Sequence, residues 1–499
     1  MSDIISTSAL LEAEILTVLR NIMKNESLTS TDNFFDIGGN SKLAMQFVTT
    51  LEKKYPQITL RRIFQYQTVK ELAQYAAFNS ENDIQEIIKS IQQVIEQTEL
   101  FFMEENCLAG KEQYEKEASQ IKIMGEKEYQ NIFVTGATGF LGSHLVKELL
   151  LNTKSNLYLL VRGKDVQTCK ERVYQKWKIY FKEQDYYQDY KSRIHIVNGD
   201  VSSPKMGMNA VQYNTLAQQI DCIIHSAAVV SHVETWEKYQ KCNVKGTENL
   251  LKFASYIKKK DFNFISTIAT EFTEERCITK KIFTEDDTLE EQKAKVLYVQ
   301  SKIECEKMVR AYAKKNIQVK IFRMGFLIQS HETGIFQENA EKNAFFGILH
   351  ILYKMKVFPA VRQKIIDVTY IDEAAKAVVL LFNKIDNLGT YHILNPKRVS
   401  ILELAEQLGT GKPELAIYEP EKFVSYLSEN QESLRSMLDR LAIMLMAELN
   451  INFGIFAVSM NQKTMAALNQ LGFTWSLLDK KAVNDMKGIL EGMSKKENR

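Results

Sequence analysis

The fold is constrained most by a regular alternation of short apolar segments and helical patterns that begins at Asn131. The apolar segments are rich in β-branched and aromatic residues, which is typical of buried strands. They are Asn131–Thr135, Leu157–Arg162, Ile194–Asn198, Cys222–His225, Phe262–Thr267 and Val319–Arg323. Because parallel strands need helical crossovers that cover both faces of a sheet, this alternation predicts an α/β fold with a doubly wound parallel sheet.

The chain has 499 residues, more than one ordinary hydrophobic core holds, so we expect a multidomain protein. Residues 1–78 have the helical periodicity of a small α-helical bundle, and residues 79–130 are expected to form a helical linker. Residues 131–400 contain the predicted sheet. Residues 401–499, with parts of 326–365, are expected to form a mostly helical C-terminal subdomain that binds the substrate.

The predicted linker has two parts. An amphipathic stripe comes first, made of Ile84, Ile87, Ile88, Ile91 and Ile95. A stretch rich in Glu and Lys, with few aliphatic residues, follows it. The stripe favours a helix, and the charged stretch favours a loosely ordered end to the linker.

Composition limits the classes of partner and compartment. With 64 basic and 62 acidic residues, the formal net charge is +2, which favours neither nucleic acid nor a membrane surface as a partner. No apolar stretch approaches the roughly 20 residues of a membrane-spanning helix, and the N-terminus lacks the pattern of a signal peptide. The six cysteines form no CxxC pair and have no histidine at metal-ligand spacing, so we expect free thiols, no metal and a cytoplasmic location.

Ser41 lies where the second helix of the N-terminal bundle is expected to begin. The preceding Gly38 and Gly39 permit a tight backbone approach, and Phe34 and Phe35 can pin this loop to the core. A serine at a helix N-terminus is accessible to a modifying enzyme, and the unpaired N–H groups and the helix dipole favour a phosphate there. These features favour the attachment of a phosphodiester-linked arm, although a plain helix cap uses the same residue.

A glycine-rich turn follows the first predicted strand and opens a helix. It contains the candidate cofactor-binding residues Gly136, Thr138, Gly139, Phe140, Leu141 and Gly142. Glycines at this spacing allow a tight turn and let a pyrophosphate approach the helix N-terminus. The strand–turn–helix context therefore predicts a Rossmann-type dinucleotide site.

Arg162 ends the next predicted strand, where an enzyme that uses NAD usually places an acidic residue for the ribose hydroxyls. A guanidinium suits a 2′-phosphate instead, so NADPH is the predicted cofactor. Arg172, on the following helix, is a second candidate for this phosphate, and a solvated surface arginine is an equally good interpretation.

Tyr298 and Lys302 are spaced i and i+4, which places a phenol and an ammonium on one helical face. An unperturbed tyrosine has a pKa of about 10, and a neighbouring cation lowers it toward the range useful for proton transfer. Thr267 closes the preceding strand and adds a hydroxyl, with Ser266 as the competing candidate. Thr267, Tyr298 and Lys302 are therefore the predicted catalytic residues, and Lys302 can also bind the nicotinamide ribose.

These motifs together resemble the extended short-chain dehydrogenase/reductase family. Residues 131–499 are similar in particular to thioester reductase domains, with resemblance fading after about residue 400. The supporting strings begin at Gly136, Leu160, Asn243, Tyr298, Arg323, Asp367 and His392. The resemblance implies that the turns Asp200-Val201 and Ser226-Ala227 contact the cofactor; a helix cap and tight packing at a strand end are the plainer interpretations of these two turns.

Residues 1–78 resemble the carrier domains of nonribosomal peptide synthetases. The matching elements are Asp32, Phe34-Phe35, Gly38-Gly39-x-Ser41, Phe64 and Thr68-Val-Lys-Glu-Leu-Ala73. The resemblance implies a 4′-phosphopantetheine arm on Ser41 and a phosphopantetheinyl transferase that attaches it. Asn40 and Gln67 depart from the residues common in such carriers, at positions that concern partner recognition more than attachment.

A carrier and a reductase on one chain imply a phosphoprotein that reduces the acyl or peptidyl thioester it carries and releases an aldehyde, or an alcohol after a second reduction. Adenylation and condensation enzymes acting in trans would load the arm. One alternative is a reductase that acts on acyl-CoA or on another protein's carrier. A non-catalytic carrier module with a decayed reductase, and a sugar-nucleotide epimerase-like enzyme, are two more.

Overall fold

The computed structural model describes most of the chain between residues 2 and 497. The positions outside the description are 1, 36, 40, 52–53, 56–57, 79–84, 86, 90, 94, 97–109, 183, 231–233, 272–281, 291, 295, 315–316, 363, 413, 435–436, 439–440, 442–458 and 498–499. Ile84 of the predicted isoleucine stripe, and Cys107 and Cys277, lie outside the described residues.

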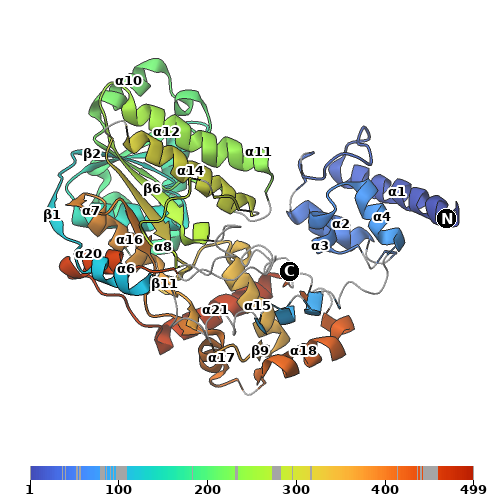
Figure 1. Cartoon of the computed structure of the whole chain (residues 1–499). Coiled ribbons are helices and arrows are strands. Elements are labelled where there is room, and N and C mark those ends of the chain that lie inside the picture. The colour runs from blue at the N-terminus through green and yellow to red at the C-terminus, as the bar shows by residue number, and fades with distance from the viewer. Residues whose placement is uncertain are drawn as a thin grey trace.

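The N-terminal bundle is made of helices α1 (Ser2–Met23), α2 (Ser41–Leu51), α3 (Leu60–Gln65) and α4 (Val69–Phe78), which gather as a cluster of their own (Figure 1). Their buried apolar faces form one small core. A capping box opens α4, because the Glu71 backbone N–H donates to Thr68 Oγ1 and the Thr68 backbone N–H donates to Glu71 Oε2, each at 3.2 Å. The short helix α3 has no counterpart among the sequence predictions.

The loop before Ser41 is fixed by aromatic packing and by glycine. Phe34 and Phe35 are 3% and 9% exposed, and the Phe34 ring stacks on Phe47 with centroids 5.9 Å apart. A Cβ on Gly39 would lie 2.2 Å from the Phe34 carbonyl oxygen, so this position accepts no side chain. Ser41 is the first residue of α2, as the sequence predicts, and the loop before it is anchored by the buried Phe34 and Phe35 side chains.

Seven described strands form a parallel sheet in the order β13-β7-β6-β5-β2-β3-β4. Their bounds are β2 (Asn131–Thr135), β3 (Asn156–Val161), β4 (Ile194–Asn198), β5 (Cys222–His225), β6 (Asp261–Thr267), β7 (Val319–Met324) and β13 (Thr390–Ile393). The first six match the predicted strands to within a residue at each end. The seventh, β13, adds an edge strand that the sequence analysis did not predict.

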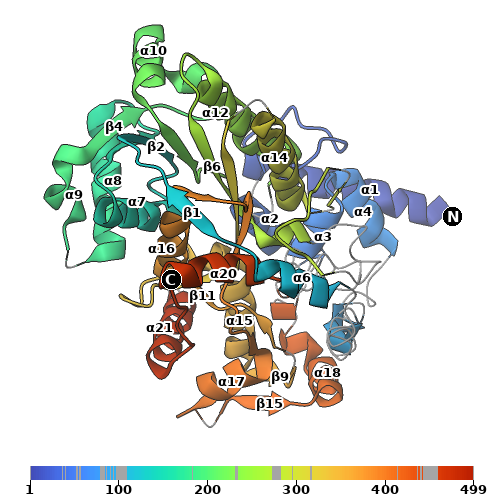
Figure 2. The same cartoon turned by 60° about the vertical axis from the view of Figure 1, so that its left-hand side comes forward.

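Helices cover both faces of the sheet, as a doubly wound fold requires (Figure 2). One face packs against α7 (Phe140–Asn152), α8 (Val166–Phe181) and α16 (Ile371–Leu381). The other packs against α10 (Ala210–Gln219), α12 (Lys245–Ser255) and α14 (Leu297–Ala313). The predicted Rossmann-type sheet is therefore confirmed.

A second core lies beside the sheet and belongs to the C-terminal subdomain. It uses helices α15 (Ala344–Met355), α17 (Ile401–Gly409), α18 (Pro420–Glu429) and α21 (Lys480–Glu497). Short strand pairs surround it: β8 (Leu327–Ile328) with β11 (Thr369–Tyr370), β9 (Val357–Pro359) with β15 (Ala416–Tyr418), and β10 (Lys364–Ile366) with β14 (Val399–Ser400). The mostly helical subdomain expected from the sequence is present, with small parallel and antiparallel pairs added to it.

Two segments belong to a different hydrophobic core from the one that a domain boundary at residue 400 would imply. Ile87, Ile88, Ile91 and Ile95 of the linker are at most 6% exposed and belong to the core of the C-terminal subdomain. Conversely, helix α20 (Gln462–Gln470) returns to the sheet, where its apolar residues join the core under α16. Segments on either side of the sheet domain in the sequence therefore contribute to the two cores: the linker isoleucines belong to the C-terminal core, and α20 belongs to the sheet core.

The end of the linker is folded rather than loose. Residues 111–118 form helix α6 (Lys111–Ala118), which lies against α20 in both views (Figures 1 and 2). Tyr114 on this helix is only 4% exposed, and β1 (Ile123–Glu126), which follows, pairs with β12 (Lys384–Asp386). The expectation of a loosely ordered end is wrong here, because the buried side chains of Tyr114, Ala118 and Ile121 and a strand pairing fix this stretch, although it is rich in charged residues.

Two short helices, α9 (Tyr186–Asp189) and α11 (Trp236–Tyr239), complete the described regular elements of the Rossmann domain. Residues 240–244 continue α11 as a short π-helical stretch that runs into α12. Among the described helices, none combines the length and the hydropathy that crossing a bilayer requires.

Candidate active site

The glycine-rich turn lies at the point where the strand order reverses. β2 is central, with β3 and β4 on one side and β5, β6, β7 and β13 on the other, so chain crossovers leave in opposite directions there. In such sheets, ligands bind outside the carboxyl ends of the strands at this switch point. The turn after β2 therefore occupies the place where the fold itself favours a ligand.

Close backbone packing explains two of the glycines. Gly136 has φ of +78°, and a Cβ there would lie 2.8 Å from the Ala227 nitrogen, so this turn is adjacent to Ser226-Ala227 after β5. A Cβ on Gly142 would lie 2.0 Å from the Gly136 carbonyl oxygen. These two positions exclude side chains and form the type of cradle that a pyrophosphate needs.

The next residues of the turn present backbone rather than side chains. Gly139 is the N-cap of α7 and makes no side-chain cap bond, so the first N–H groups of the helix face the turn. The Phe140 ring packs on Tyr180, 5.4 Å away, and Leu141 packs into the sheet core. Thr138 is half-buried in the turn.

The candidate phosphate-binding arginines lie near each other after β3. Arg162 Nη1 is 3.8 Å from Asp200 Oδ2, and Arg172 Nη1 donates to the Arg162 carbonyl at 3.1 Å. The Arg162 side chain is 64% exposed. Val201 is held by an Asn249 amide that donates to its carbonyl at 2.8 Å. The structure thus brings together Arg162, Arg172, Asp200 and Val201 at the carboxyl ends of β3 and β4.

Thr267 and Ser266 have different surroundings. Ser266 is 3% exposed, and its hydroxyl donates to Glu306 Oε1 at 2.6 Å inside the fold. Thr267, the last residue of β6, is half-buried, and its hydroxyl accepts from the Ala269 backbone N–H at 3.2 Å. Strand alternation therefore directs Ser266 into the core and leaves Thr267 at the tip of the strand, which supports the choice of Thr267.

Lys302 lies one turn after Tyr298 on helix α14 and is buried with it. Its ammonium donates to the Ile265 carbonyl at 2.8 Å and lies 4.9 Å from the centroid of the Phe264 ring. Burial lowers the pKa of Lys302 to about 8, although the nearby Cys305 and Glu306 act in the opposite direction. A lysine in this state remains largely cationic at neutral pH but releases its proton easily.

A buried chain of hydrogen bonds under the switch point was missed by the sequence analysis. His225 Nδ1 is 2.8 Å from Thr135 Oγ1, and its Nε2 is 3.1 Å from Thr247 Oγ1. Because Thr247 donates its proton to the Asn243 carbonyl, its oxygen accepts from Nε2–H. His225 Nδ1 then accepts from Thr135, whose oxygen accepts from the Ala227 N–H.

This chain fixes the turn at Ser226-Ala227 through protein groups alone. Burial and, to a smaller extent, the charge of Lys302 lower the pKa of His225 to about 3, so the imidazole stays neutral and keeps the tautomer derived above. The sequence signal that could have identified this residue was the position of His225 at the end of a predicted strand, directly before the turn of small residues.

Asn243 is a second residue whose role the sequence analysis missed, because it appeared there only as the start of a motif. Its side-chain amide donates to Ser301 Oγ at 2.9 Å and to the Val229 carbonyl at 3.0 Å, and its Oδ1 accepts from the Val229 N–H at 2.8 Å. It lies in the π-helical stretch, a local irregularity that occurs often at functional sites. Asn243 thereby ties the turn after β5 to α14, which carries Tyr298.

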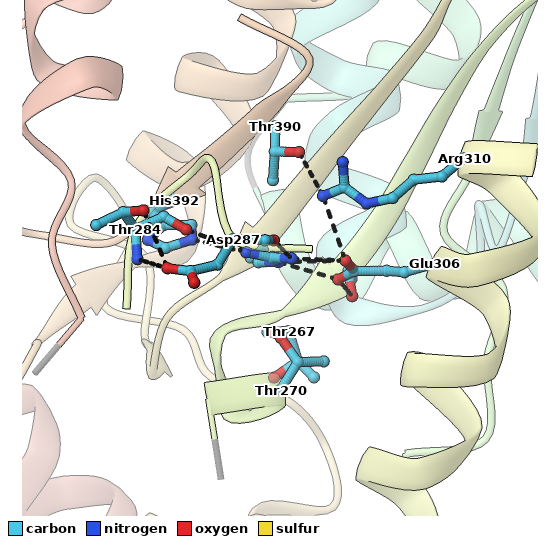
Figure 3. A network of polar contacts seen from close by, with 10 residues as sticks. Thr267, Thr270, Thr284, Asp287, Glu306, Arg310, Thr390 and His392 are labelled. Atoms are coloured by element: carbon cyan, nitrogen blue, oxygen red, sulfur yellow. Dashed lines mark hydrogen bonds and ion pairs between the residues drawn. The ribbon is translucent and has the colours of Figure 1, made fainter. Parts of the chain in front are cut away.

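A buried ion-pair network supports the other side of β6. Arg323 of β7 donates to Glu306 Oε2 of α14 at 2.8 Å, and both side chains are 0% exposed. Figure 3 shows Glu306 next to Arg310, with Thr284, Asp287 and His392 together on the opposite side of the network. Burial alone would raise the pKa of Glu306, but the charge and hydrogen bonds of Arg323 and the Ser266 hydroxyl bring it below its ordinary value.

The described residues contain no group of histidine, cysteine and carboxylate side chains suited to a metal ion. The described cysteines Cys169, Cys222, Cys242 and Cys305 are free thiols.

Comparison with protein families accounts for both halves of the molecule. Residues 134–378 match the family described as male sterility protein with an NAD-binding domain, and residues 11–76 match the family of the phosphopantetheine attachment site. The chain therefore contains one segment that matches a phosphopantetheine attachment domain and, after it, one that matches a male sterility-type NAD-binding domain. We call residues 1–78 the carrier domain and the part from residue 131 onward the reductase domain. The expected cofactor classes, a nicotinamide dinucleotide and a phosphopantetheine arm, are confirmed.

Individual relatives match large parts of the chain. The chain is 29% identical to one of the polypeptides of linear gramicidin synthase from Brevibacillus parabrevis, over 75% of this chain and 7% of that protein. It is 28% identical to L-2-aminoadipate reductase of Saccharomyces cerevisiae over 62% of this chain and 23% of that protein. The chain therefore spans less than a quarter of the length of either relative.

Among solved structures, the fold is similar to that of a thiolation-reductase di-domain from an archaeal non-ribosomal peptide synthetase. The likeness covers 97% of this chain and 98% of that one, with a TM-score of 0.73 and 24% sequence identity. The predicted architecture, a helical carrier bundle followed by a Rossmann-type domain, is confirmed by this likeness.

Proposed function

We propose that this protein is an NADPH-dependent thioester reductase, which releases an acyl or peptidyl group from the phosphopantetheine arm on Ser41 as an aldehyde. The observation that carries the proposal is the pairing on one chain of a phosphopantetheine attachment domain with an NAD-binding domain, which also contains the predicted catalytic residues Thr267, Tyr298 and Lys302. A tethered thioester has a high effective concentration at such a site without any added contact.

The residues present fit NADPH. The cradle at Gly136 and Gly142, where a Cβ would clash, suits the pyrophosphate, and the exposed guanidinium of Arg162 suits a 2′-phosphate. When bound, NADPH supplies the hydride that reduces the thioester carbonyl. The overall reaction consumes one thioester, one NADPH and one proton, and gives an aldehyde, the free thiol and NADP⁺.

The chain's own groups would stabilise the negative charge that develops on the carbonyl oxygen. The Tyr298 phenol and the Thr267 hydroxyl would donate hydrogen bonds to this oxygen, and preorganised donors of this kind contribute most to many acyl-transfer reactions. Lys302, whose pKa is lowered to about 8 by burial, would favour proton release from Tyr298 and orient the ribose.

The proposed partners follow from the carrier domain. A phosphopantetheinyl transferase would attach the arm, and adenylation or condensation enzymes acting in trans would load it with the acyl group. Neither step uses the reductase domain, so loading and reduction can be tested separately.

The central test uses purified protein that bears the arm and a loaded thioester. We expect NADPH consumption with stoichiometric aldehyde, trapped as a hydrazone and identified by mass spectrometry. Replacing Tyr298 with Phe is expected to lower kcat by at least about 100-fold, a common contribution of a general acid, while leaving the loaded mass intact. Full turnover in that variant would remove Tyr298 from the reaction, and an inactive wild-type protein would refute the proposal.

A second comparison separates the carried thioester from a soluble one. Ser41→Ala is expected to block attachment of the arm, which intact-mass measurement detects, and to abolish reduction of the tethered substrate. If this variant and the wild-type protein both reduce an acyl-CoA thioester faster than the wild type reduces its own loaded arm, the acyl-CoA reductase alternative is the better assignment.

A further inference from the structure

We propose that Tyr114, on linker helix α6, is a positioning residue for the catalytic centre: through Glu285 it holds residues 283–289 against the apolar surroundings of Tyr298. The inference rests on the proposed function for Tyr298, and it assigns to the linker a part in the reductase site. Its evidence is a set of contacts between three segments that are far apart in the sequence.

The contact between linker and loop is short and buried. The Tyr114 hydroxyl donates to Glu285 Oε2 at 2.6 Å across 171 residues of sequence, and the two residues are 4% and 3% exposed. The second carboxylate oxygen, Oε1, accepts from the Thr464 backbone N–H at 2.9 Å and from its hydroxyl at 2.8 Å. Glu285 thus joins the linker to the start of α20.

Lys463 also stabilises this contact between α6, the loop and α20, from the solvent-facing side. Its ammonium lies 2.9 Å from Glu117 of α6 and also pairs with Asp286 of the loop. The Lys463 side chain is 7% exposed, so these pairs lie at the edge of the buried contact. Opposite charges therefore clamp α6, the loop and the start of α20 together.

Residues 283–289 depend on such anchors because they form no helix or extended strand of their own. From the core side, Arg323 donates to the Thr284 carbonyl at 3.3 Å and to the Asp287 carbonyl at 2.9 Å. From the linker side, Tyr114 reaches Glu285. The loop is held between these two anchors, so losing one loosens it without releasing it.

The loop also forms part of the wall around Tyr298. Phe283 and Leu289 are 0% and 1% exposed and belong to the same apolar cluster as Tyr298, Val299 and Ile303. Because packed interiors transmit small shifts, a displaced Phe283 or Leu289 would alter the placement of the phenol. Proton transfer and hydrogen bonding at a developing oxyanion are sensitive to sub-ångström placement, so the expected effect is on kcat.

The chain offers a matched control. The Tyr129 hydroxyl donates to Asp261 Oδ2 at 2.7 Å, and Asp261 begins the same strand, β6, that ends at Thr267. Tyr129→Phe therefore removes a tyrosine–carboxylate hydrogen bond of similar length at the opposite end of that strand. Both variants should lose stability, and only the loss at Tyr114 should reach the catalytic centre.

The experiment measures kcat, the KM for NADPH and backbone hydrogen exchange in full-length, loaded protein. Tyr114→Phe is expected to lower kcat about tenfold, the effect of leaving one buried acceptor with a missing donor, with the KM for NADPH unchanged. Peptides covering residues 283–289 should exchange faster in this variant. Tyr129→Phe should change neither kcat nor exchange in these peptides.

Glu285→Gln serves as a second variant, because it keeps the side-chain shape and loses one acceptor. It is expected to reproduce the fall in kcat. Equal kcat values for Tyr114→Phe and Tyr129→Phe, or unchanged exchange at residues 283–289 in both Tyr114→Phe and Glu285→Gln, would overturn the proposal. If the wild-type protein reduces no thioester, the function proposed above fails on its own, and the exchange measurement still decides whether the linker holds the loop.

Discussion

Two arginines at the carboxyl side of the same sheet have opposite surroundings. Arg323, in β7, is 0% exposed and donates to Glu306 at 2.8 Å, to two loop carbonyls and toward His392. Arg162, directly after β3, is 64% exposed, and its ion pair with Asp200 spans 3.8 Å, beyond hydrogen-bond length. One guanidinium is saturated by the protein, whereas the other keeps its donors toward solvent.

The difference separates a residue that maintains the fold from one that suits a ligand. A buried guanidinium is tolerated only when its charge and its donors are matched, as those of Arg323 are. An exposed one beside a dinucleotide cradle can exchange water for a phosphate at little structural cost. Four predictions test this contrast, from the largest expected effect to the smallest.

The largest effect is expected for Arg323→Ala. Removing this side chain leaves Glu306 buried without its main cation, which costs about 3–5 kcal/mol of unfolding free energy in comparable cases. Urea unfolding measures the loss. The double variant Arg323→Met with Glu306→Leu should recover most of it, and a loss below about 1 kcal/mol for the single variant, the size typical of an exposed pair, would contradict the contrast.

Arg162→Ala should leave stability within about 0.5 kcal/mol of the wild type, as expected for an exposed side chain. Because the variant loses a charge-assisted contact to the 2′-phosphate, kcat/KM for NADPH should fall about 10–100-fold, with little change for NADH. Parallel kinetics with the two cofactors measure this. An equal loss with both would show that Arg162 does not discriminate between them.

Lowering the pH below 4.5 should weaken the buried ion pair between Arg323 and Glu306. The pKa of Glu306 is held below its ordinary value of 4.5 in the folded protein, so its stabilising contribution is present above pH 4.5 and is lost as pH falls through the folded pKa. The stability difference between the wild type and the Arg323→Met, Glu306→Leu double variant should shift against the wild type below pH 4.5, by at most about 1.4 kcal/mol per pH unit. If this difference stays constant as the pH falls from about 6 to about 3, the protonation of Glu306 is not linked to folding.

Asp200→Asn should have the smallest effect. It removes the negative charge near Arg162, and exposed pairs of this kind contribute about 0–1 kcal/mol, so the KM for NADPH should fall by no more than about threefold. Steady-state kinetics at low and high salt measure the change. A tenfold rise in KM would indicate instead that Asp200 contacts the cofactor directly.

Much of the fold was predictable because local patterns and the sheet agree. The six predicted strands are apolar on both faces, and the turn at Gly136 sits between a strand and a helix, so periodicity and turn chemistry indicate the same architecture. β13 escaped because Thr390–Ile393 is only four residues long. Its pairing with β7 is a tertiary contact that no local pattern encodes.

The candidate site was predictable where spacing along one element determines geometry. Tyr298 and Lys302 share a helix, and Thr267 ends a strand, so their arrangement follows from periodicity. The contact of Tyr114 with Glu285 joins residues 171 positions apart, so the sequence gives no sign of the partner, although Tyr114 is the one aromatic residue of α6. Contacts of this kind depend on how separate elements pack, which a single sequence does not reveal.

The isoleucines of the linker have a practical consequence for anyone who produces the catalytic half alone. Each buried isoleucine side chain contributes about 1.5–3 kcal/mol, and Ile87, Ile88, Ile91 and Ile95 together approach the whole net stability of an ordinary domain, about 5–15 kcal/mol. A shortened polypeptide that starts at β2 would lack these isoleucines and would expose the apolar surface that they cover. Recombinant versions should therefore begin ahead of Gln85, and those that do not should aggregate.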